Sequence, residues 1–165
     1  MAKGQKKKVF ISYFNRNEED ANRLFWILYN ENLSPWLDWF DLSGAKDWDE
    51  YIEKAIKNTI VFISLLTPEV ADHFKTLISE DSTEEEKKNA QRYYQTEIKW
   101  AKHYGKPIIY LAVNGYTFEE DYHKFLIGTI DTKDAIILHV NLKYDDNALD
   151  KMFKMIKEMT EKYEK

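Results

Sequence analysis

Two long apolar runs, separated by amphipathic stretches, constrain the fold of this chain most strongly. The runs cover 59–66 (TIVFISLL) and 107–113 (PIIYLAV), and each is long enough for a strand that is buried on both faces. Shorter β-rich runs at 9–13, 35–37 and 135–138 lie between segments with helical spacing of apolar residues. Strands that alternate with helices indicate a parallel sheet covered on both faces. We therefore predict an α/β fold, a flavodoxin-like doubly wound domain with a five-stranded parallel sheet.

Helices are predicted between these strands and after the last one. Inward-facing apolar positions support them, for example Ala21, Leu24, Phe25 and Leu28 in the first helix. The predicted helices cover 18–31 with Asn17 as N-cap, 47–58, 93–104 with Gly105 as C-cap, and a closing segment through Leu149, Met152, Phe153, Ile156 and Met159.

Composition narrows the class of protein. The chain has 165 residues, no cysteine and a net charge of −5. This length fits one domain over 1–165, and the lack of cysteine excludes thiol nucleophiles and fits a cytoplasmic location. The negative charge argues against a nucleic-acid partner. No apolar run approaches the roughly 20 residues of a membrane span, so no membrane partner is expected.

Two segments depart from the alternating pattern. Lysines at positions 3, 6, 7 and 8 mark 1–7 as a basic, flexible N-terminus, either a solvated tail or a guard against aggregation of the first strand. Residues 75–91 are polar and charged, with few apolar anchors. We predict an exposed insertion there, before the 93–104 helix.

Glu97 is a carboxylate in an unexpected place. At about 100° per residue, it lies in the middle of an arc formed by Trp100, Tyr93, Tyr104, Ala101, Tyr94 and Ile98. An acid inside an aromatic arc is costly unless another group pairs with it, and such acids are functional candidates. A slightly rotated helix would instead place Glu97 at a solvated edge. The helix alone does not separate these two interpretations.

Several common chemical motifs are missing. No G-x-G-x-x-G follows the first strand, and no G-K-[ST] occurs, so the usual phosphate-binding loops are not supported. The four histidines show no HExxH spacing, so no metal site is predicted. There is also no G-x-S-x-G nucleophile elbow around Ser64.

What remains is a series of motifs in a characteristic order. They are 9–13 (VFISY), Asp38 after the second strand, 42–56 (LSGAKDWDEYIEKAI), Ile63-Ser64 in the third strand, and 96–101 (TEIKWA) followed by 105–109 (GKPII). Together, over about 8–113, they resemble the signatures of the TIR domain family.

The resemblance implies a TIR fold and an enzymatic role. In enzymatic members, the acid that matches Glu97 is the catalytic residue for cleavage of the nicotinamide–ribose bond of NAD+. NAD+ is then the substrate, no cofactor is implied, and the products are nicotinamide with ADP-ribose or a cyclic isomer. Free-standing domains of this kind resemble the signal-producing proteins of bacterial anti-phage systems such as Thoeris. The implied partners are further copies of the chain and a product-sensing effector.

Candidate substrate-binding residues follow the predicted strands or lie on the predicted helices: Phe14, Asn15, Arg16, Asp38, Trp39, Gly44, Trp48, Ser64 and Tyr93. The rings of Phe14, Trp39 and Trp48 either stack on the substrate or pack in the core. Arg16 either meets a phosphate or is solvated. For Asp38 and Ser64 a hydrogen-bonding role within the protein is favoured, and Gly44 would give its loop backbone freedom.

Two other functions remain open. Many TIR domains act as adaptors that self-associate through the loop that corresponds to 38–48 here. A nucleoside-processing enzyme, such as a deoxyribosyltransferase, also places a carboxylate on ribose. Competition between NAD+ and deoxynucleosides as substrates would distinguish an NAD+-cleaving enzyme from a deoxyribosyltransferase.

Overall fold

The computed structural model describes residues 7–13, 17–37, 48–68, 83–85, 97–115, 136–142 and 146–163. Their strands are β1 (Val9–Ser12), β2 (Pro35–Trp36), β3 (Val61–Leu66), β4 (Ile108–Val113) and β5 (Ile136–Val140). The helices are α1 (Glu18–Asn30), α2 (Trp48–Asn58) and α6 (Asp146–Tyr163), and residues 97–103 are also helical. All strand pairs are parallel in the order β2-β1-β3-β4-β5, which confirms the predicted doubly wound α/β fold.

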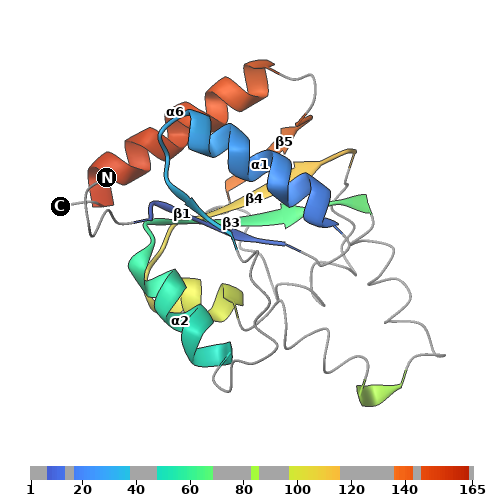
Figure 1. Cartoon of the computed structure of the whole chain (residues 1–165), viewed down its shortest axis with the longest axis vertical. Coiled ribbons are helices and arrows are strands. Elements are labelled where there is room, and N and C mark those ends of the chain that lie inside the picture. Colours follow the sequence, from blue (N-terminus) through green and yellow to red (C-terminus); the bar gives the residue numbers. More distant parts are fainter. Residues whose placement is uncertain are drawn as a thin grey trace.

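Helices cover both faces of the sheet (Figure 1). α1 and α6 lie on one face, and α2 and the helical residues 97–103 lie on the other. The core beneath α1 and α6 takes alternate strand residues, such as Ile11, Ile63 and Leu111. The residues that alternate with them are buried too, including Phe10 and Phe62. The central strands are therefore mostly apolar on both faces because helices cover both of their faces.

Aromatic rings form a stacked row on the α2 side of the sheet. The Phe10 ring stacks on Trp36 at 4.8 Å and on Phe62 at 5.3 Å between ring centroids. This row crosses β2, β1 and β3, because Phe10 is the register partner of both other residues. Such rings bury large apolar areas and give the α2 side a rigid floor.

For seven of the eight elements with predicted bounds, both the start and the end agree with the prediction to within two residues. For the predicted 93–104 helix, only its part from Glu97 onward lies within the described residues. Of the predicted insertion over 75–91, the structure describes only 83–85, and all three of these residues are exposed. Of the predicted 1–7 segment, only Lys7 is described, and it is exposed as well.

Two details of α1 differ from the expectation. Phe25 was predicted to face inward, and it does pack against the core, but it is only partly buried. Asn17 occupies the N-cap position, yet its side chain makes no capping hydrogen bond. Instead the buried Asn17 Oδ1 accepts a hydrogen bond of 2.8 Å from Thr67 Oγ1. A tertiary contact has therefore replaced local capping.

Gly105 ends the helical segment 97–103, as predicted. It has a φ of +66°, a left-handed conformation that favours glycine. Its N–H donates to Lys102 O at 3.1 Å, and the Lys106 N–H donates to Ala101 O at 2.9 Å. This pair of bonds is a Schellman motif, which satisfies carbonyls at the helix end and turns the chain towards β4.

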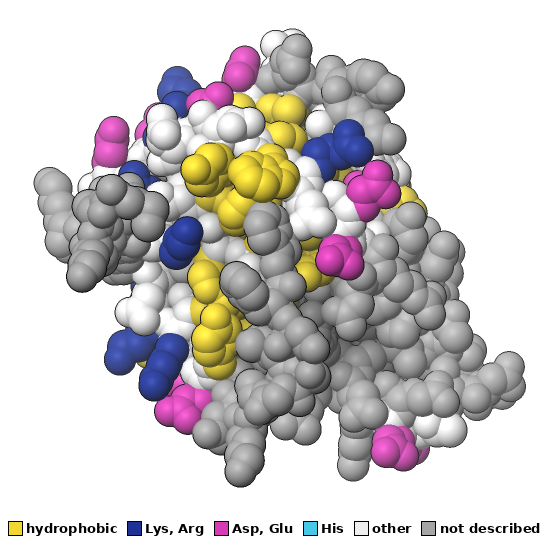
Figure 2. All heavy atoms as spheres, in the orientation of Figure 1, with side chains coloured by type: hydrophobic (Ala, Val, Ile, Leu, Met, Phe, Trp, Pro, Cys, Tyr) yellow, Lys and Arg dark blue, Asp and Glu magenta, His cyan; other side chains and the backbone are white. Residues whose placement is uncertain are grey.

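Aromatic side chains are exposed on the outer helices. Trp26 and Tyr29 on α1 and Tyr51 on α2 are 50 %, 56 % and 43 % exposed. Figure 2 shows hydrophobic side chains gathered on this face of the molecule, in the region of α1. None of the described helices is long and apolar enough to cross a membrane.

Candidate active site

Residues that carry hydroxyl groups lie in one row across the sheet at the carboxyl end of β1. Ser12 is the register partner of Ser64, and Ser64 is the register partner of Tyr110, so the three residues form one row across β1, β3 and β4. All three are buried. Residues two apart on a strand point to the same face of the sheet. Ser12 and Ser64 therefore lie on the same face as Phe10 and Phe62, two residues nearer the carboxyl end. The α2 side of the sheet thus changes from aromatic to polar at this edge.

The carboxylate of Glu97 reaches this row. Ser12 Oγ donates a buried hydrogen bond to Glu97 Oε2, across 85 positions of sequence. Glu97 is only 7 % exposed. The structure therefore decides between the two interpretations that the sequence left open: Glu97 is buried, and its placement at a solvated edge is wrong. The hydrogen bond supplies the polar partner that a buried carboxylate requires.

Chain direction explains why Glu97 lies at the carboxyl edge. In a parallel α/β sheet, each crossover helix runs from the carboxyl edge of the strands back to the amino edge. The segment from Glu97 to Gly105 leads into β4, so Glu97 lies at the far end from the start of that strand. Ile98 and Ala101, on the same segment, are buried and fix its rotation.

The Ser12–Glu97 pair also lies at the switch in strand order. The chain moves from β1 outward to β2 on one side and from β3 outward to β4 on the other. Ligands of doubly wound folds bind outside the carboxyl ends of the strands at such a switch point. Ser12 and Ser64 belong to the two strands that flank it.

The structure places some of the predicted site residues and not others. Glu97 and Ser64 both lie on the α2 side of the sheet, with Ser64 in the hydroxyl row. Trp48 begins α2, but its side chain lies outside the described part. The remaining candidates lie outside the described residues: Phe14, Asn15, Arg16, Asp38, Trp39, Gly44 and Tyr93.

Ser12 and Tyr110 were not among the predicted site residues. Ser12 had a signal in the sequence, since it is a polar residue that ends an otherwise apolar strand on the same face as Phe10. Tyr110 had a weaker signal, a phenol within an aliphatic run. The register that brings both into one row with Ser64 is a tertiary property, so the sequence did not show it.

A second polar contact fastens the Glu97 segment to α2. The Tyr104 hydroxyl donates to Glu53 Oε1 at 2.5 Å, and Lys57 Nζ lies 5.9 Å from the centre of the Tyr104 ring. The hydrogen bond to Glu53, with some burial, raises the pKa of Tyr104 above its ordinary value of 10.0. The Trp100 and Tyr104 rings stack at 6.1 Å along the same segment. The contacts of Tyr104 with Glu53 and Lys57 hold the segment that carries Glu97 against α2.

We expect an alkaline loss of stability that depends on Tyr110. Burial raises the pKa of Tyr110 above 10.0, so the folded protein keeps the phenol proton where the unfolded chain loses it. The stabilising effect is complete below pH 10.0 and is lost as pH rises through the raised value. Tyr110→Phe should show a smaller fall in melting temperature between pH 8 and pH 11 than the wild type. An equal fall in both proteins would contradict this assignment.

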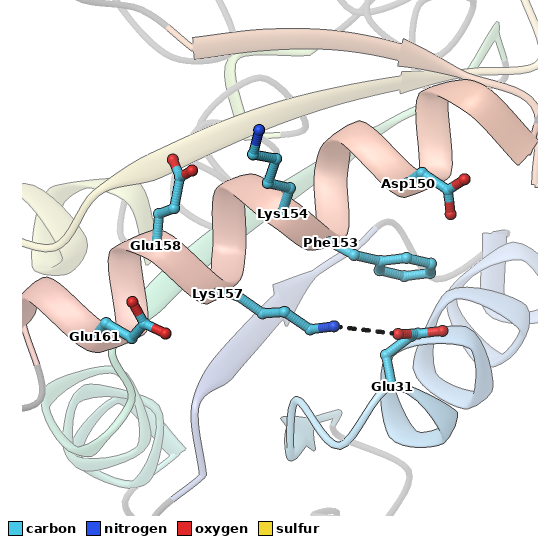
Figure 3. A pocket seen from close by; sticks show the side chains of 7 residues that line it. All are labelled: Glu31, Asp150, Phe153, Lys154, Lys157, Glu158 and Glu161. Atoms are coloured by element: carbon cyan, nitrogen blue, oxygen red, sulfur yellow. Dashed lines mark hydrogen bonds and ion pairs between the residues drawn. The ribbon is translucent and has the colours of Figure 1, made fainter.

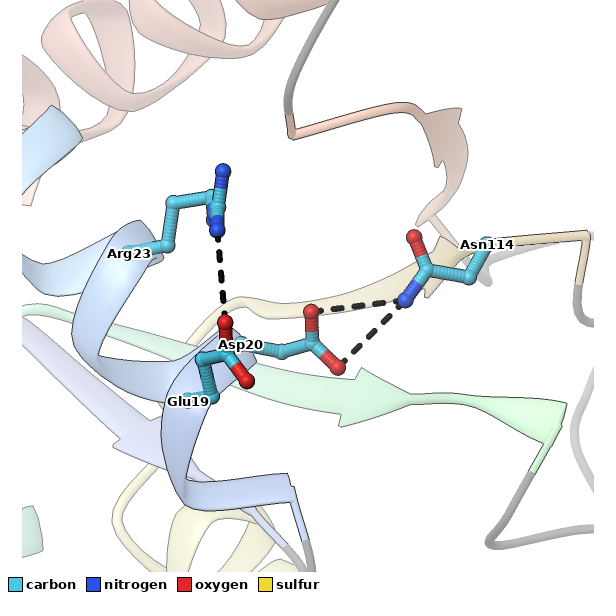
Figure 4. Close-up of polar contacts among 4 residues, drawn as sticks. All are labelled: Glu19, Asp20, Arg23 and Asn114. Carbon is cyan, nitrogen blue, oxygen red and sulfur yellow. Dashed lines mark hydrogen bonds and ion pairs between the residues drawn. The ribbon is translucent and has the colours of Figure 1, made fainter.

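The carboxyl edge has a further polar contact on its α1 side (Figure 4). Asn114 Nδ2 donates to both carboxylate oxygens of Asp20 at 3.3 Å, and Arg23 lies 3.6 Å from Glu19. Asn114 and Gly115 both have positive φ, 57° and 84°. This contact ties the turn after β4 to the first turn of α1. The participating side chains are exposed and serve the fold at this edge.

A shallow pocket lies elsewhere, between the end of α1 and α6 (Figure 3). Its lining is mostly charged: Glu31, Asp150, Phe153, Lys154, Lys157, Glu158 and Glu161. Lys157 pairs with Glu31 at 3.4 Å. This pocket is on the α1–α6 side of the sheet, the opposite side from Glu97, and has no row of buried polar groups. Within the described ranges, no three His, Asp or Glu side chains gather to hold a metal ion.

Comparison with known proteins identifies a family. A family model described as TIR domain matches residues 9–153. No curated protein matches the sequence. Among solved structures, the chain is similar to the CMP N-glycosidase BcmB of Clostridium botulinum, with 16 % identity and a TM-score of 0.46. That similarity covers 90 % of this chain and 99 % of the other.

Proposed function

We propose that this chain, which belongs to the TIR domain family, is an NAD+ glycohydrolase with Glu97 as its catalytic residue. One observation carries the proposal: the Glu97 carboxylate is buried at the switch point and accepts a hydrogen bond from Ser12. Burying a carboxylate costs stability, and such groups occur preferentially at functional sites. A buried carboxyl group with a hydrogen-bond donor, at the edge where this fold binds ligands, supports the proposal.

The reaction makes chemical use of such a charge. The bond between ribose C1′ and the nicotinamide nitrogen breaks, and its electron pair returns to the cationic ring, so nicotinamide leaves as a neutral molecule. Positive charge of the oxocarbenium type develops on the ribose. Water then bonds to C1′ and loses one proton, which gives ADP-ribose. If a nucleophilic group of the same ADP-ribosyl cation bonds to C1′ in place of water, again with loss of one proton, the product is a cyclic isomer.

A buried carboxylate suits this transition state. Its negative charge opposes the developing positive charge, and low polarity strengthens the attraction. No strong general acid is needed, because the leaving group becomes neutral on departure. A single well-placed acid is therefore sufficient for bond cleavage in this proposal.

The test is nicotinamide release from NAD+ at high protein concentration, followed by chromatography or NMR. We expect nicotinamide to accumulate, and the co-product to be ADP-ribose or a cyclic isomer. Parallel reactions with deoxynucleosides test the deoxyribosyltransferase alternative. Base release from deoxynucleosides without nicotinamide release from NAD+ would replace the proposed substrate. If folded protein releases neither nicotinamide nor a base over about three decades of protein concentration, an adaptor function would be favoured.

We further propose that activity depends on self-association. Aromatic residues are enriched in protein interfaces, and Trp26, Tyr29 and Tyr51 are exposed on the outer helices. Turnover per subunit should rise with protein concentration and reach a plateau once assembly is complete. Activity measured over about three decades of concentration, beside light scattering, checks this. A constant turnover per subunit while the scattering mass grows would contradict it.

The biological role follows from the proposed product. A soluble product of NAD+ cleavage can serve as a signal, and we propose such a role in anti-phage defence of the Thoeris type, with a separate effector that binds the product. Identification of the co-product is the first step, since it names the compound that a sensing effector would recognise.

A further inference from the structure

We infer that Ser12 is a positioning residue for Glu97, an inference that rests on the proposed NAD+ cleavage. The Ser12 hydroxyl donates to Glu97 Oε2, and both side chains are buried. A glutamate side chain has three rotatable angles and can point its carboxylate in several directions. A donor at a fixed place therefore selects one direction for the carboxylate.

Ser12 is a suitable fixed donor because it belongs to β1, an interior strand of the sheet. β1 lies between β2 and β3, and Ser12 is paired in register with Ser64 of β3. The stacked Phe10, two residues earlier on the same face, packs against Trp36 and Phe62. The position of Ser12 is thus held by its pairing with β3 and by the packed ring of Phe10 two residues earlier.

The chemistry of the bond suits the proposed reaction. A hydroxyl that donates to a carboxylate favours the ionised form of that group, and such charge-assisted bonds are stronger than neutral ones. The ionised form is the one that stabilises a cationic transition state. Ser12 thus acts on the ribose through Glu97, without needing a contact of its own to substrate.

The same bond also fixes the start of the β1–α1 connection. The positions 14–16, which hold the predicted substrate contacts Phe14, Asn15 and Arg16, follow Ser12 and Tyr13 in the chain. Asn17, on their far side, accepts a buried hydrogen bond from Thr67 at 2.8 Å. Ser12 and Asn17 are therefore each engaged in a buried side-chain hydrogen bond, one to Glu97 and one to Thr67, the residue after β3.

The kinetic test uses Ser12→Ala and Ser12→Thr. Ser12→Ala should lower kcat for nicotinamide release about 10-fold, with KM within about twofold, because the lost bond acts in the transition state and not in substrate binding. Ser12→Thr keeps the hydroxyl and should recover most of the rate. A raised KM at unchanged kcat, or equal rates for Ser12→Ala and the wild type, would overturn the inference. So would an equally slow Ser12→Thr with an unchanged melting temperature.

A double-mutant cycle measures the coupling between Ser12 and Glu97 through protein stability, without substrate. The unfolding equilibrium constants of Ser12→Ala, Glu97→Ala and the double variant are compared. We expect the double variant to unfold at least about fivefold less readily than the product of the single effects predicts. If the effects of the two single substitutions on the unfolding equilibrium constant simply multiply, Ser12 and Glu97 are not coupled and the inference is overturned. Thr160→Val, which removes a buried hydroxyl bonded to Lys157 O within α6, is the control and should multiply with Glu97→Ala.

The two experiments keep the inference separate from the proposed function. If the wild type releases no nicotinamide, the proposed function fails, and the stability cycle alone then decides whether Ser12 holds Glu97. If the wild type is active but Ser12→Ala is equally fast, the positioning role fails while the proposed function stands. If the added methyl group of Ser12→Thr prevents folding, the stability cycle decides the inference, because it does not use that variant.

Discussion

Nicotinamide release by Glu97→Gln is expected to be slower than release by the wild type by a factor of about 10² or more. Glutamine keeps the size of the side chain and can still accept a hydrogen bond from Ser12, but it carries no charge. The loss should appear in kcat, because the charge acts on the positive charge that develops in the transition state. Initial rates of nicotinamide formation at saturating NAD+ measure this change.

Glu31→Gln is the matched control for this loss. Glu31 is a carboxylate on the α1–α6 side of the sheet, where it pairs with Lys157 at 3.4 Å. The same loss of charge there should leave kcat within about twofold of the wild type, since an exposed ion pair contributes little. Equal release by Glu97→Gln and the wild type would show that Glu97 is not catalytic. Unfolding of Glu97→Gln is excluded by an unchanged circular dichroism spectrum.

The sheet could be predicted from the sequence because strands that are buried on both faces are runs of mostly apolar residues. Strands β3 (VFISLL) and β4 (IIYLAV) are apolar on both faces except for Ser64 and the phenol of Tyr110, and no helix of ordinary amphipathic character has that pattern. The burial of Glu97 was also foreseen as one of two alternatives, since its neighbours Ile98 and Ala101 repeat at helical spacing. In both cases the signal is local, within a few turns or one strand.

The partner of Glu97 could not be predicted in this way. Ser12 and Glu97 are 85 positions apart, and they meet only because the Glu97 segment packs on the α2 side of β1 at its carboxyl end. The side chain of Asn17 likewise bonds Thr67 and not its own helix, so a local capping rule gave the right boundary and the wrong contact. Contacts of this kind depend on strand register and helix placement, which no single segment encodes.

Phe62→Ala is expected to cause the largest loss of stability among single changes to the aromatic row, about 3–5 kcal/mol. Phe62 is fully buried in β3, and its ring stacks on Phe10 at an interplanar angle of 8°. Removal of the ring loses apolar burial and leaves a cavity in the middle of the sheet, where paired strands on both sides limit collapse. Urea unfolding followed by circular dichroism at equilibrium measures the change in the free energy of unfolding.

Tyr29→Ala provides the comparison that separates burial from loss of a ring. Tyr29 is 56 % exposed, so its removal should cost about 1 kcal/mol or less, even though it stacks on Phe25. Phe62→Leu, which keeps most of the buried volume, should fall between the two. A loss below about 1 kcal/mol for Phe62→Ala would mean that the aromatic row does not support the sheet. Because Phe62 lies two residues before Ser64 on the same face, such a result would also weaken the argument that this row fixes the hydroxyls beside Glu97.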